Sequence, residues 1–277
     1  MNFIDRFTEP LRFAIENGYN YLIGKYFLSN ESSLDLYASI LFVLIYWMIG
    51  SLFILMEIYE KPKFLMHFKI QKGKSQIQKI ALQRTIKQVL INQLLTLAIA
   101  YWVHCGQRMP HSNRVPSLTR FLLEWTVFFL SREIAFYYSH RILHHRLIYK
   151  HIHKKHHEWQ TPIAIAAIYC NPIEHLISNI IPVVIGPYLM HSHRLTYYLW
   201  VLYATLLTLS DHCGYHFPFT LPPIFHDFHH LKFNVNYGIL GLLDWIHGTD
   251  KQFRESKYFA KNRIYFSLNS PSALLSE

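Results

Sequence analysis

Residues 36–56 read LYASILFVLIYWMIGSLFILM, a run of 21 residues without a charged side chain. At about 1.5 Å of rise per residue, a helix of this length crosses the hydrocarbon core of a bilayer, which is roughly 30 Å thick. The run therefore predicts a transmembrane helix, and with it an integral-membrane protein built from helices.

The composition of the whole chain agrees with a membrane protein. Apolar residues make up 51% of the 277 residues and charged residues 16%, against roughly 25% charged residues in a typical soluble domain. The net charge of +10 does not indicate a nucleic-acid partner, because the basic residues lie between apolar runs, as they do in cytoplasmic loops. Three cysteines (Cys105, Cys170 and Cys213) show no metal-type spacing and predict no disulfide framework.

Further apolar runs follow along the chain. Residues 88–103 carry no charge and pair with 36–56 as a first hairpin, while 176–190 and 195–210 form a second hairpin or a partly re-entrant pair. We expect an all-α integral-membrane bundle of about four spanning helices in two hairpins. Residues 1–117 hold the N-terminal segment with the first hairpin, and residues 118–277 hold the catalytic region of the same membrane domain.

The loop charges predict the orientation of this bundle. Residues 61–87 contain eight Lys and Arg and no acid, whereas 104–119 contain only two Arg. Because Lys and Arg gather in cytoplasmic loops, we expect the 61–87 loop, the histidine-rich segments and the C-terminus to be cytosolic.

Histidine is the unusual residue of this chain. Of 19 histidines, 16 lie between His140 and His247. They form the strings HRILH (140–144), HKKHH (153–157), HCGYH (212–216) and HDFHH (226–230). An HxxxH pattern followed by an HxxHH pattern therefore occurs twice along the chain. Histidine is the commonest metal ligand, and two histidines spaced i, i+4 share one face of a helix.

Four such clusters within 91 residues predict metal binding. The candidate ligands are His140, His144, His153, His156, His157, His212, His216, His226, His229 and His230. Ten imidazoles exceed the four ligands of one structural zinc site, so two adjacent metals fit better. Imidazole suits Zn, Cu, Fe and Ni alike, and spacing alone does not choose among them.

The histidine strings, in this order, resemble the sterol desaturase/fatty acid hydroxylase superfamily of integral-membrane di-iron enzymes. The resemblance runs from about Leu118 to Asp250 and includes EIAFYYSHRILHH, YKHIHKKHHEW, NPIEH, HCGYHFP, FHDFHHLKFNVNYG and LDWIHGTD. Within the superfamily the chain looks most like C4-methylsterol oxidases and their metazoan fatty acid hydroxylase domain-containing relatives.

The resemblance implies a cytosolic histidine-rich di-metal cap on a multi-pass bundle in the endoplasmic reticulum membrane. It implies two Fe ions held by the ten histidines, with no catalytic residue beyond the metal ligands. It also implies O₂-dependent oxidation of a membrane lipid, with electrons from NAD(P)H passing through cytochrome b5 and its reductase. The chain contains no HPGG-type haem motif, so the electron donor is expected to be a separate protein.

Other polar residues near the boxes are candidates for the surroundings of the metals. His175 and Glu174 in NPIEH could lie behind the ligands, and Asp211, Asp227 and Asp244 could accept the free N–H of ligand imidazoles, although each could equally cap a loop or turn. Arg132 and Glu133 lie two helical turns before His140, where an ion pair is as consistent as a catalytic role. His145 and His151 lie beside ligands and could be alternate ligands, but they are expected to face solvent. His191 and His193, in the short connection between apolar runs, are expected to be lumenal or interfacial and not ligands.

Three functions compete at this point. Oxidation of the C4 methyl of a sterol is the leading hypothesis, and hydroxylation of fatty acyl chains or sphingolipids is the alternative enzyme. A non-enzymatic metal-binding membrane regulator is the third. A zinc transporter is a weaker alternative, because transporters place their ligands near the bilayer midplane and most of these histidines lie outside the apolar runs.

Overall fold

The computed structural model describes residues 3–26, 31–71, 77–106 and 114–268, and these residues form helices and loops without any β-strand. The longer helices are α1 (Phe3–Tyr26), α2 (Glu31–Tyr59), α4 (Lys79–Gly106), α5 (Leu118–Leu143), α7 (Ile181–Met190) and α8 (Arg194–His212). The shorter helices are α3 (Lys63–Met66), α6 (Pro172–Glu174), α9 (Ile224–Lys232), α10 (Leu242–His247) and α11 (Lys251–Arg254). A π-helix, η3 (His175–Ile180), joins α6 to α7, and three short 3₁₀ segments are η1 (His156–Glu158), η2 (Ala164–Ile168) and η4 (Phe259–Lys261).

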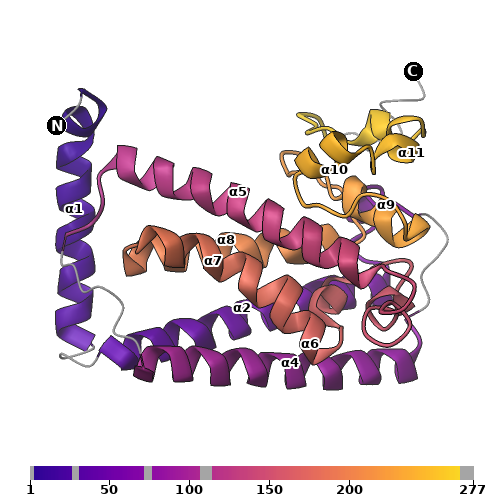
Figure 1. Cartoon of the computed structure of the whole chain (residues 1–277), viewed down its shortest axis with the longest axis horizontal. Coiled ribbons are helices and arrows are strands. Elements are labelled where there is room, and N and C mark those ends of the chain that lie inside the picture. Colours follow the sequence, from indigo (N-terminus) through magenta and orange to yellow (C-terminus); the bar gives the residue numbers. More distant parts are fainter. Residues whose placement is uncertain (1–2, 27–30, 72–76, 107–113, 269–277) are drawn as a thin grey trace.

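The helices form an elongated bundle with different elements at its two ends (Figure 1). Helices α2, α4, α5, α7 and α8 run along the long axis of the molecule. Helix α1 lies across one end of the bundle, and α9, α10 and α11 gather at the other. The all-α prediction is therefore confirmed for the described residues.

Two helical segments among the described residues are long and apolar enough to cross a membrane, namely Leu34–Tyr59 and Pro172–Met190. In the first, Leu41, Leu44, Met48, Leu52 and Leu55 are exposed at helical spacing, which is how a lipid-facing helix presents itself. The predicted runs 88–103 and 195–210 are helical and lie within α4 and α8. In the part of the chain that the structure describes, neither helix combines the length and the mean hydropathy found in the two segments above. The four-span arrangement and its cytosolic orientation stay predictions.

Aromatic side chains hold the centre of the bundle together. Trp200 of α8 is fully buried, and its ring centroid lies 5.3 Å from that of Phe128 and 5.1 Å from that of Phe129, both on α5. The Trp200 indole N–H donates to the carbonyl of Val183 in α7 at 2.9 Å. Such pairs add to the free energy of apolar burial, and here they join three helices around one interior.

A buried segment links the bundle to the histidine-rich end. Segment η2 contains side chains with no exposed surface, including Ile165. The Tyr46 hydroxyl of α2 donates to the Ile165 carbonyl at 2.9 Å, and the Asn92 amide of α4 donates to the Ile168 carbonyl at 2.8 Å. Because η2 is hydrogen-bonded to both helices, the histidines that precede it and Glu174, which follows it, are held in fixed positions.

Candidate di-metal centre

Nine of the ten predicted ligand histidines converge in two neighbouring groups. The first group is His140, His144, His153, His157 and His229, and the second is His156, His212, His226 and His230. Within each group, one ring nitrogen of every histidine lies within 4.8 Å of those of all the others. All nine rings are buried except that of His144, which is partly buried.

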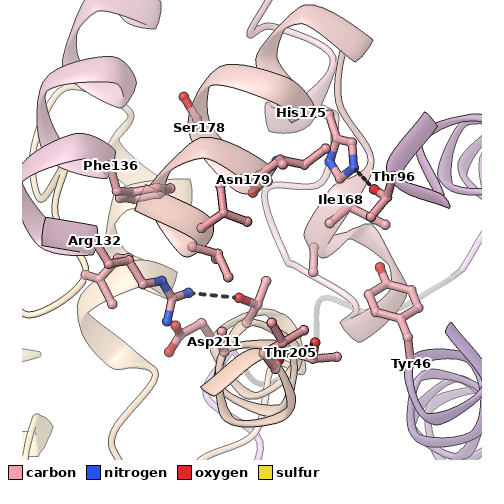
Figure 2. A pocket seen from close by; sticks show the side chains of 18 of the residues that line it. Tyr46, Thr96, Arg132, Phe136, Ile168, His175, Ser178, Asn179, Thr205 and Asp211 are labelled. Atoms are coloured by element: carbon pink, nitrogen blue, oxygen red, sulfur yellow. Dashed lines mark hydrogen bonds between the residues drawn. The ribbon is translucent and has the colours of Figure 1, made fainter. Parts of the chain in front are cut away.

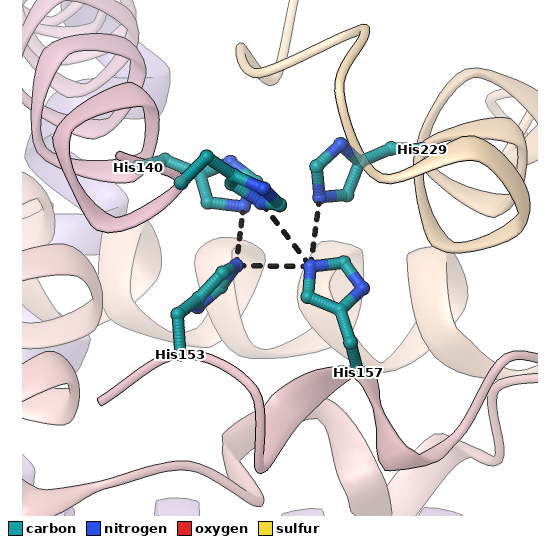
Figure 3. Close-up of side chains that lie close together, drawn as sticks. His140, His153, His157 and His229 are labelled. Carbon is teal, nitrogen blue, oxygen red and sulfur yellow. Dashed lines mark hydrogen bonds between the residues drawn. The ribbon is translucent and has the colours of Figure 1, made fainter. Parts of the chain in front are cut away.

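The first group draws on three parts of the chain (Figure 3). His140 lies in the last turn of α5, His153 and His157 lie in the loop after it and in η1, and His229 lies in α9. The His153 Nε2 atom lies 3.1 Å from that of His140 and 3.0 Å from that of His157, and the His157 Nε2 atom lies 3.2 Å from that of His229. His144, the residue that ends α5, brings its Nε2 within 3.2 Å of the same His157 atom.

The second group shares two of its segments with the first. Its Nε2 atoms are separated by 3.4 Å between His156 and His212, 3.0 Å between His212 and His226, and 3.1 Å between His226 and His230. Each HxxHH string therefore divides between the groups. The i, i+4 pair shares one face and enters one group, while the histidine at i+3 points to the other.

Hydrogen bonds at Nδ1 determine which nitrogen of each ring faces the centre. The Nδ1 atoms of His140, His153 and His229 contact the Tyr237 carbonyl at 2.7 Å, Glu174 Oε1 at 2.7 Å and the Val235 carbonyl at 2.6 Å. In the second group, the Nδ1 atoms contact carbonyls of Thr208 and Trp159, at 2.9 Å from His212 and 3.1 Å from His230. A carbonyl can only accept, so in the four rings held by carbonyls Nδ1 carries the proton of the neutral ring and Nε2 carries a lone pair.

Ring nitrogens that converge this closely are arranged to hold a cation between them. The neutral His140 ring carries its proton on Nδ1, so its Nε2 offers only a lone pair in the 3.1 Å contact with Nε2 of His153. Metal–nitrogen bonds of about 2.0–2.1 Å place two ligand nitrogens about 2.9 Å apart at right angles and about 3.4 Å apart at a tetrahedral angle. The measured separations of 3.0–3.4 Å fit this range, so each group is suited to hold one metal ion.

Burial keeps these imidazoles neutral, as metal binding requires. Desolvation lowers the pKa of His140 and of His212 to about 4, and desolvation together with neighbouring imidazoles lowers the pKa of His144 to about 2. The same causes lower the pKa of His226 and His229 well below the ordinary value. At neutral pH the nitrogens are therefore free to bind metal without first losing a proton.

His216 does not join either group, contrary to the expectation from its HxxxH spacing. Helix α8 ends at His212, and Gly214 adopts a left-handed φ of +78°, so the chain turns away before the next helical position is reached. The His216 amide donates to the Phe68 carbonyl at 2.9 Å, and its ring packs against Tyr265 with centroids 5.2 Å apart. Both of its ring nitrogens are buried without a hydrogen-bond partner among the described residues.

Glu174 lies directly behind a ligand, in the position predicted for it. It is buried, and its carboxylate contacts Nδ1 of His153. Such a carboxylate fixes the ring orientation and increases the basicity of the ligand nitrogen. His175, predicted beside it, instead pairs its Nε2 with the Thr96 hydroxyl at 2.8 Å and lines a cavity (Figure 2).

The three aspartates predicted to accept from ligand imidazoles have different surroundings. Asp244 accepts the backbone N–H groups of Tyr237 and Gly238, both at 2.7 Å, and so positions the carbonyl that holds His140. Asp227 accepts from the Gln71 amide at 3.1 Å. Asp211 lines the cavity described below.

Glu133 supports the same loop, a role that the sequence did not suggest. Its carboxylate accepts the backbone N–H groups of Ile239 at 2.9 Å and Leu240 at 2.8 Å, instead of pairing with Arg132. A Cβ atom on Gly238 would lie 2.7 Å from this carboxylate and 2.8 Å from that of Asp244, so only glycine fits between them.

The other histidines lie outside both groups. His145, His151 and His191 are exposed. His193 is buried at the start of α8, where its Nδ1 accepts the Leu195 amide at 3.1 Å.

A cavity of about 250 Å³ lies inside the bundle next to the histidine groups, and Figure 2 shows part of its lining, including Arg132, His175 and Asp211. At one end it is lined by ligands of both groups, among them His140 and His212. Further along it is lined by apolar side chains of α7 and α8, including Val183 and Val201, and it reaches Tyr198 near the far end. The arrangement can hold a mostly apolar molecule with one part against the two metal positions.

The described residues form an all-helical bundle with two segments long and apolar enough to cross a membrane and two buried imidazole groups that could each hold a metal ion, which is the architecture of a helical, membrane-associated metalloprotein. Comparison with known proteins agrees. The profile described as fatty acid hydroxylase matches residues 125–249. The human fatty acid hydroxylase domain-containing protein 2 is 42% identical over 224 residues, which cover 79% of this chain and 67% of that protein.

Two further relatives widen the comparison. Methylsterol monooxygenase 2-2 of Arabidopsis thaliana is 31% identical over 265 residues, which cover 90% of this chain and 96% of that protein. A very-long-chain aldehyde decarbonylase of Oryza sativa is 31% identical over 215 residues, which cover 72% of this chain and 80% of that protein. No solved structure matches the chain. The chain belongs to the fatty acid hydroxylase family, within the sterol desaturase/fatty acid hydroxylase superfamily of lipid-oxidising, non-haem di-iron enzymes.

Proposed function

We propose that this protein is an O₂-dependent di-iron monooxygenase that oxidises the C4 methyl group of a sterol. The observation that carries the proposal is the pair of buried imidazole groups at the head of a mainly apolar cavity. The similarity to methylsterol monooxygenase 2-2, which extends over 96% of that protein, supports a sterol as the lipid.

Iron is proposed because the C–H bond to be oxidised is unreactive. A methyl group of a lipid has no acidic proton and no leaving group, so acid–base chemistry at side chains cannot attack it. Iron bound in both groups would supply the activation of O₂ that such a C–H bond requires. The nine imidazoles of the two groups are ligands that suit iron. His216, the tenth predicted ligand, lies outside both groups in this structure.

The protein itself performs three tasks. The carbonyl and carboxylate partners of Nδ1 hold the imidazoles in place, as Glu174 does for His153. Burial of the rings excludes water from the metal positions. The apolar cavity walls bind the lipid and orient the carbon to be oxidised toward the histidines.

The proposal extends to the supply of electrons and the location. NAD(P)H provides the electrons through cytochrome b5 and its reductase, and the histidine-rich end faces the cytosol from the endoplasmic reticulum membrane. Protease treatment of sealed microsomes tests the location, because a C-terminal tag shielded from added protease would contradict it.

Purified protein supplied with the reductase, cytochrome b5 and ¹⁸O₂ tests the reaction. The label is expected in the oxidised methyl group of a 4-methylsterol. Because the family profile is that of fatty acid hydroxylases, fatty acids and ceramides are tested in parallel, and labelled hydroxyacyl products alone would replace the sterol with an acyl lipid. An iron-loaded protein that consumes no O₂ with any of these lipids would favour a metal-binding membrane regulator instead.

A further inference from the structure

The wall of the cavity carries a buried arginine with hydrogen-bonding capacity left over. Arg132 of α5 is 7% exposed, and its Nη2 donates to the Thr208 hydroxyl of α8 at 3.2 Å. Its Nη1 is buried without a hydrogen-bond partner among the described residues. A buried donor to which nothing is bound is costly, and for a charged group the cost is larger still. The guanidinium therefore offers a binding position to a molecule in the cavity.

An acid lines the same part of the cavity (Figure 2). Asp211 of α8 lies beside Arg132 in this view, and both residues line the cavity. The structure shows no hydrogen bond or ion pair between these two described side chains, although their charges are opposite. A small group that accepts from the guanidinium and donates to the carboxylate would satisfy both, and a hydroxyl is the simplest group that does so.

The chemistry of this pair also discriminates between lipids. A free carboxylate would accept from Arg132 but has no proton to donate to Asp211, whereas a hydroxyl can do both. The Trp200 ring lies 5.9 Å from the guanidinium carbon, and the apolar side chains of Val183 and Val201 line the cavity together with the Thr205 and Thr208 hydroxyls.

The position of the pair relates it to the metal groups. Thr208, which accepts from Arg132 through its hydroxyl, also accepts from Nδ1 of His212 through its carbonyl. Thr208 lies one helical turn before His212, a rise of about 6 Å. A hydroxyl held by Arg132 therefore brings the carbons next to it close to the second histidine group.

We infer that Arg132 and Asp211 form a hydroxyl-binding subsite, which selects a lipid alcohol over a free fatty acid and places a carbon near the hydroxyl against the second histidine group. The inference rests on the proposed function in one respect, because it takes the occupant of the cavity to be the lipid that is oxidised. In a 4-methylsterol the methyl group is attached to the carbon next to the one that carries the hydroxyl, which suits this arrangement. Both residues act as positioning residues.

Binding without turnover tests the subsite separately from the reaction. The full-length, metal-loaded protein in nanodiscs is titrated without reductant, and four unlabelled lipids displace a tritiated 4-methylsterol. The four are the same 3-hydroxysterol, its 3-deoxy analogue, its 3-methoxy ether and a long-chain fatty acid. The wild type is expected to bind the alcohol about 10- to 100-fold more tightly than the deoxy analogue, as befits a buried hydrogen bond to a charged group. The ether, which can accept but not donate, is expected between them.

Variants assign the preference to the two side chains. Arg132→Gln and Asp211→Asn are expected to bring the ratio of alcohol to deoxy affinity to within about threefold of unity, with Arg132→Lys retaining part of the preference. Arg141→Gln is the matched control, because Arg141 lies on the same helix, is exposed and contacts the Tyr137 hydroxyl outside the cavity. Its ratio is expected to equal that of the wild type, and metal content and elution volume confirm that each variant is folded.

Two results would overturn the subsite. One is a wild type that binds the deoxy analogue or the fatty acid as tightly as the alcohol, which requires no variant to fold. The other is a folded Arg132→Gln protein with the full wild-type preference. Failure of the proposed function has a different signature, namely hydroxyl-dependent binding by a protein that oxidises no lipid in the ¹⁸O₂ assay.

Discussion

The contact between Glu174 and His153 makes a quantitative prediction about metal affinity. The Glu174 carboxyl group lies 2.7 Å from Nδ1 of His153, and both side chains are buried. Removal of such a partner typically lowers metal affinity 10- to 100-fold, equivalent to about 1.4–2.7 kcal/mol. Glu174→Gln keeps an acceptor oxygen but loses the carboxyl group, so we expect a loss near tenfold. Glu174→Ala loses both and should approach 100-fold.

Competition with a chelator of known affinity measures this loss. The metal retained per protein is determined by mass spectrometry as the chelator concentration rises, and the midpoint of the curve gives the apparent affinity. Glu124→Gln is the control, because Glu124 is a buried acid of the same bundle whose partner is Arg120 and not a ligand. It is expected to lower the free energy of unfolding without moving the chelator midpoint. Wild-type metal affinity in Glu174→Ala would refute the role assigned to this carboxylate.

Three further predictions concern the ligands and their support. His226→Ala should lower the bound metal substantially, whereas His216→Ala should leave it within about twofold of the wild type; equal losses in the two variants would place His216 among the ligands after all. Gly238→Ala should lower both metal affinity and melting temperature, because its Cβ would lie 2.7 Å from the Glu133 carboxylate; an unchanged chelator midpoint would show that this loop is not needed for binding. The pKa of His140 is lowered from an ordinary value near 6.5 to about 4, so between these values the unfolded chain binds more protons than the folded one. The free energy of unfolding of the metal-free protein should therefore fall as the pH drops from about 6.5 toward 4, by up to about 1.4 kcal/mol per pH unit for this residue. A melting temperature that does not change over that pH range would contradict the buried neutral state.

The histidine spacing predicted most of the site because local geometry carries most of it. Residues at i and i+4 share a helical face, and His226 and His230 of α9 indeed enter the same group. His216 lies outside both groups because α8 does not continue through HCGYH. Gly214 gives a left-handed turn there, and a glycine just past a helix is a signal of helix termination that the sequence itself contained.

Other parts of the site could not be predicted from residue types. Four of the acceptors that orient ligand rings are backbone carbonyls, for example those of Tyr237 and Val235, and any residue could supply them. Glu133 supports the ligands through backbone N–H groups of a loop more than 100 residues later, a contact that only the tertiary fold creates. The apolar run 195–210, predicted as part of a second hairpin or a partly re-entrant pair, places Trp200 and Ala204 of α8 in the buried interior of the bundle, which the run alone did not show.

The division of each HxxHH string between the two groups has a consequence for how the protein matures in the cell. His156 lies between His153 and His157 in sequence, and His229 lies between His226 and His230. Each short segment therefore contributes ligands to both groups. An ion that enters one group orders the backbone that presents ligands to the other, and loss of either ion loosens both. The protein is thus expected to acquire its ions together and to exist as filled or empty molecules, with few in between. When the metal is scarce, the number of filled molecules would decline, while each filled molecule keeps its full activity.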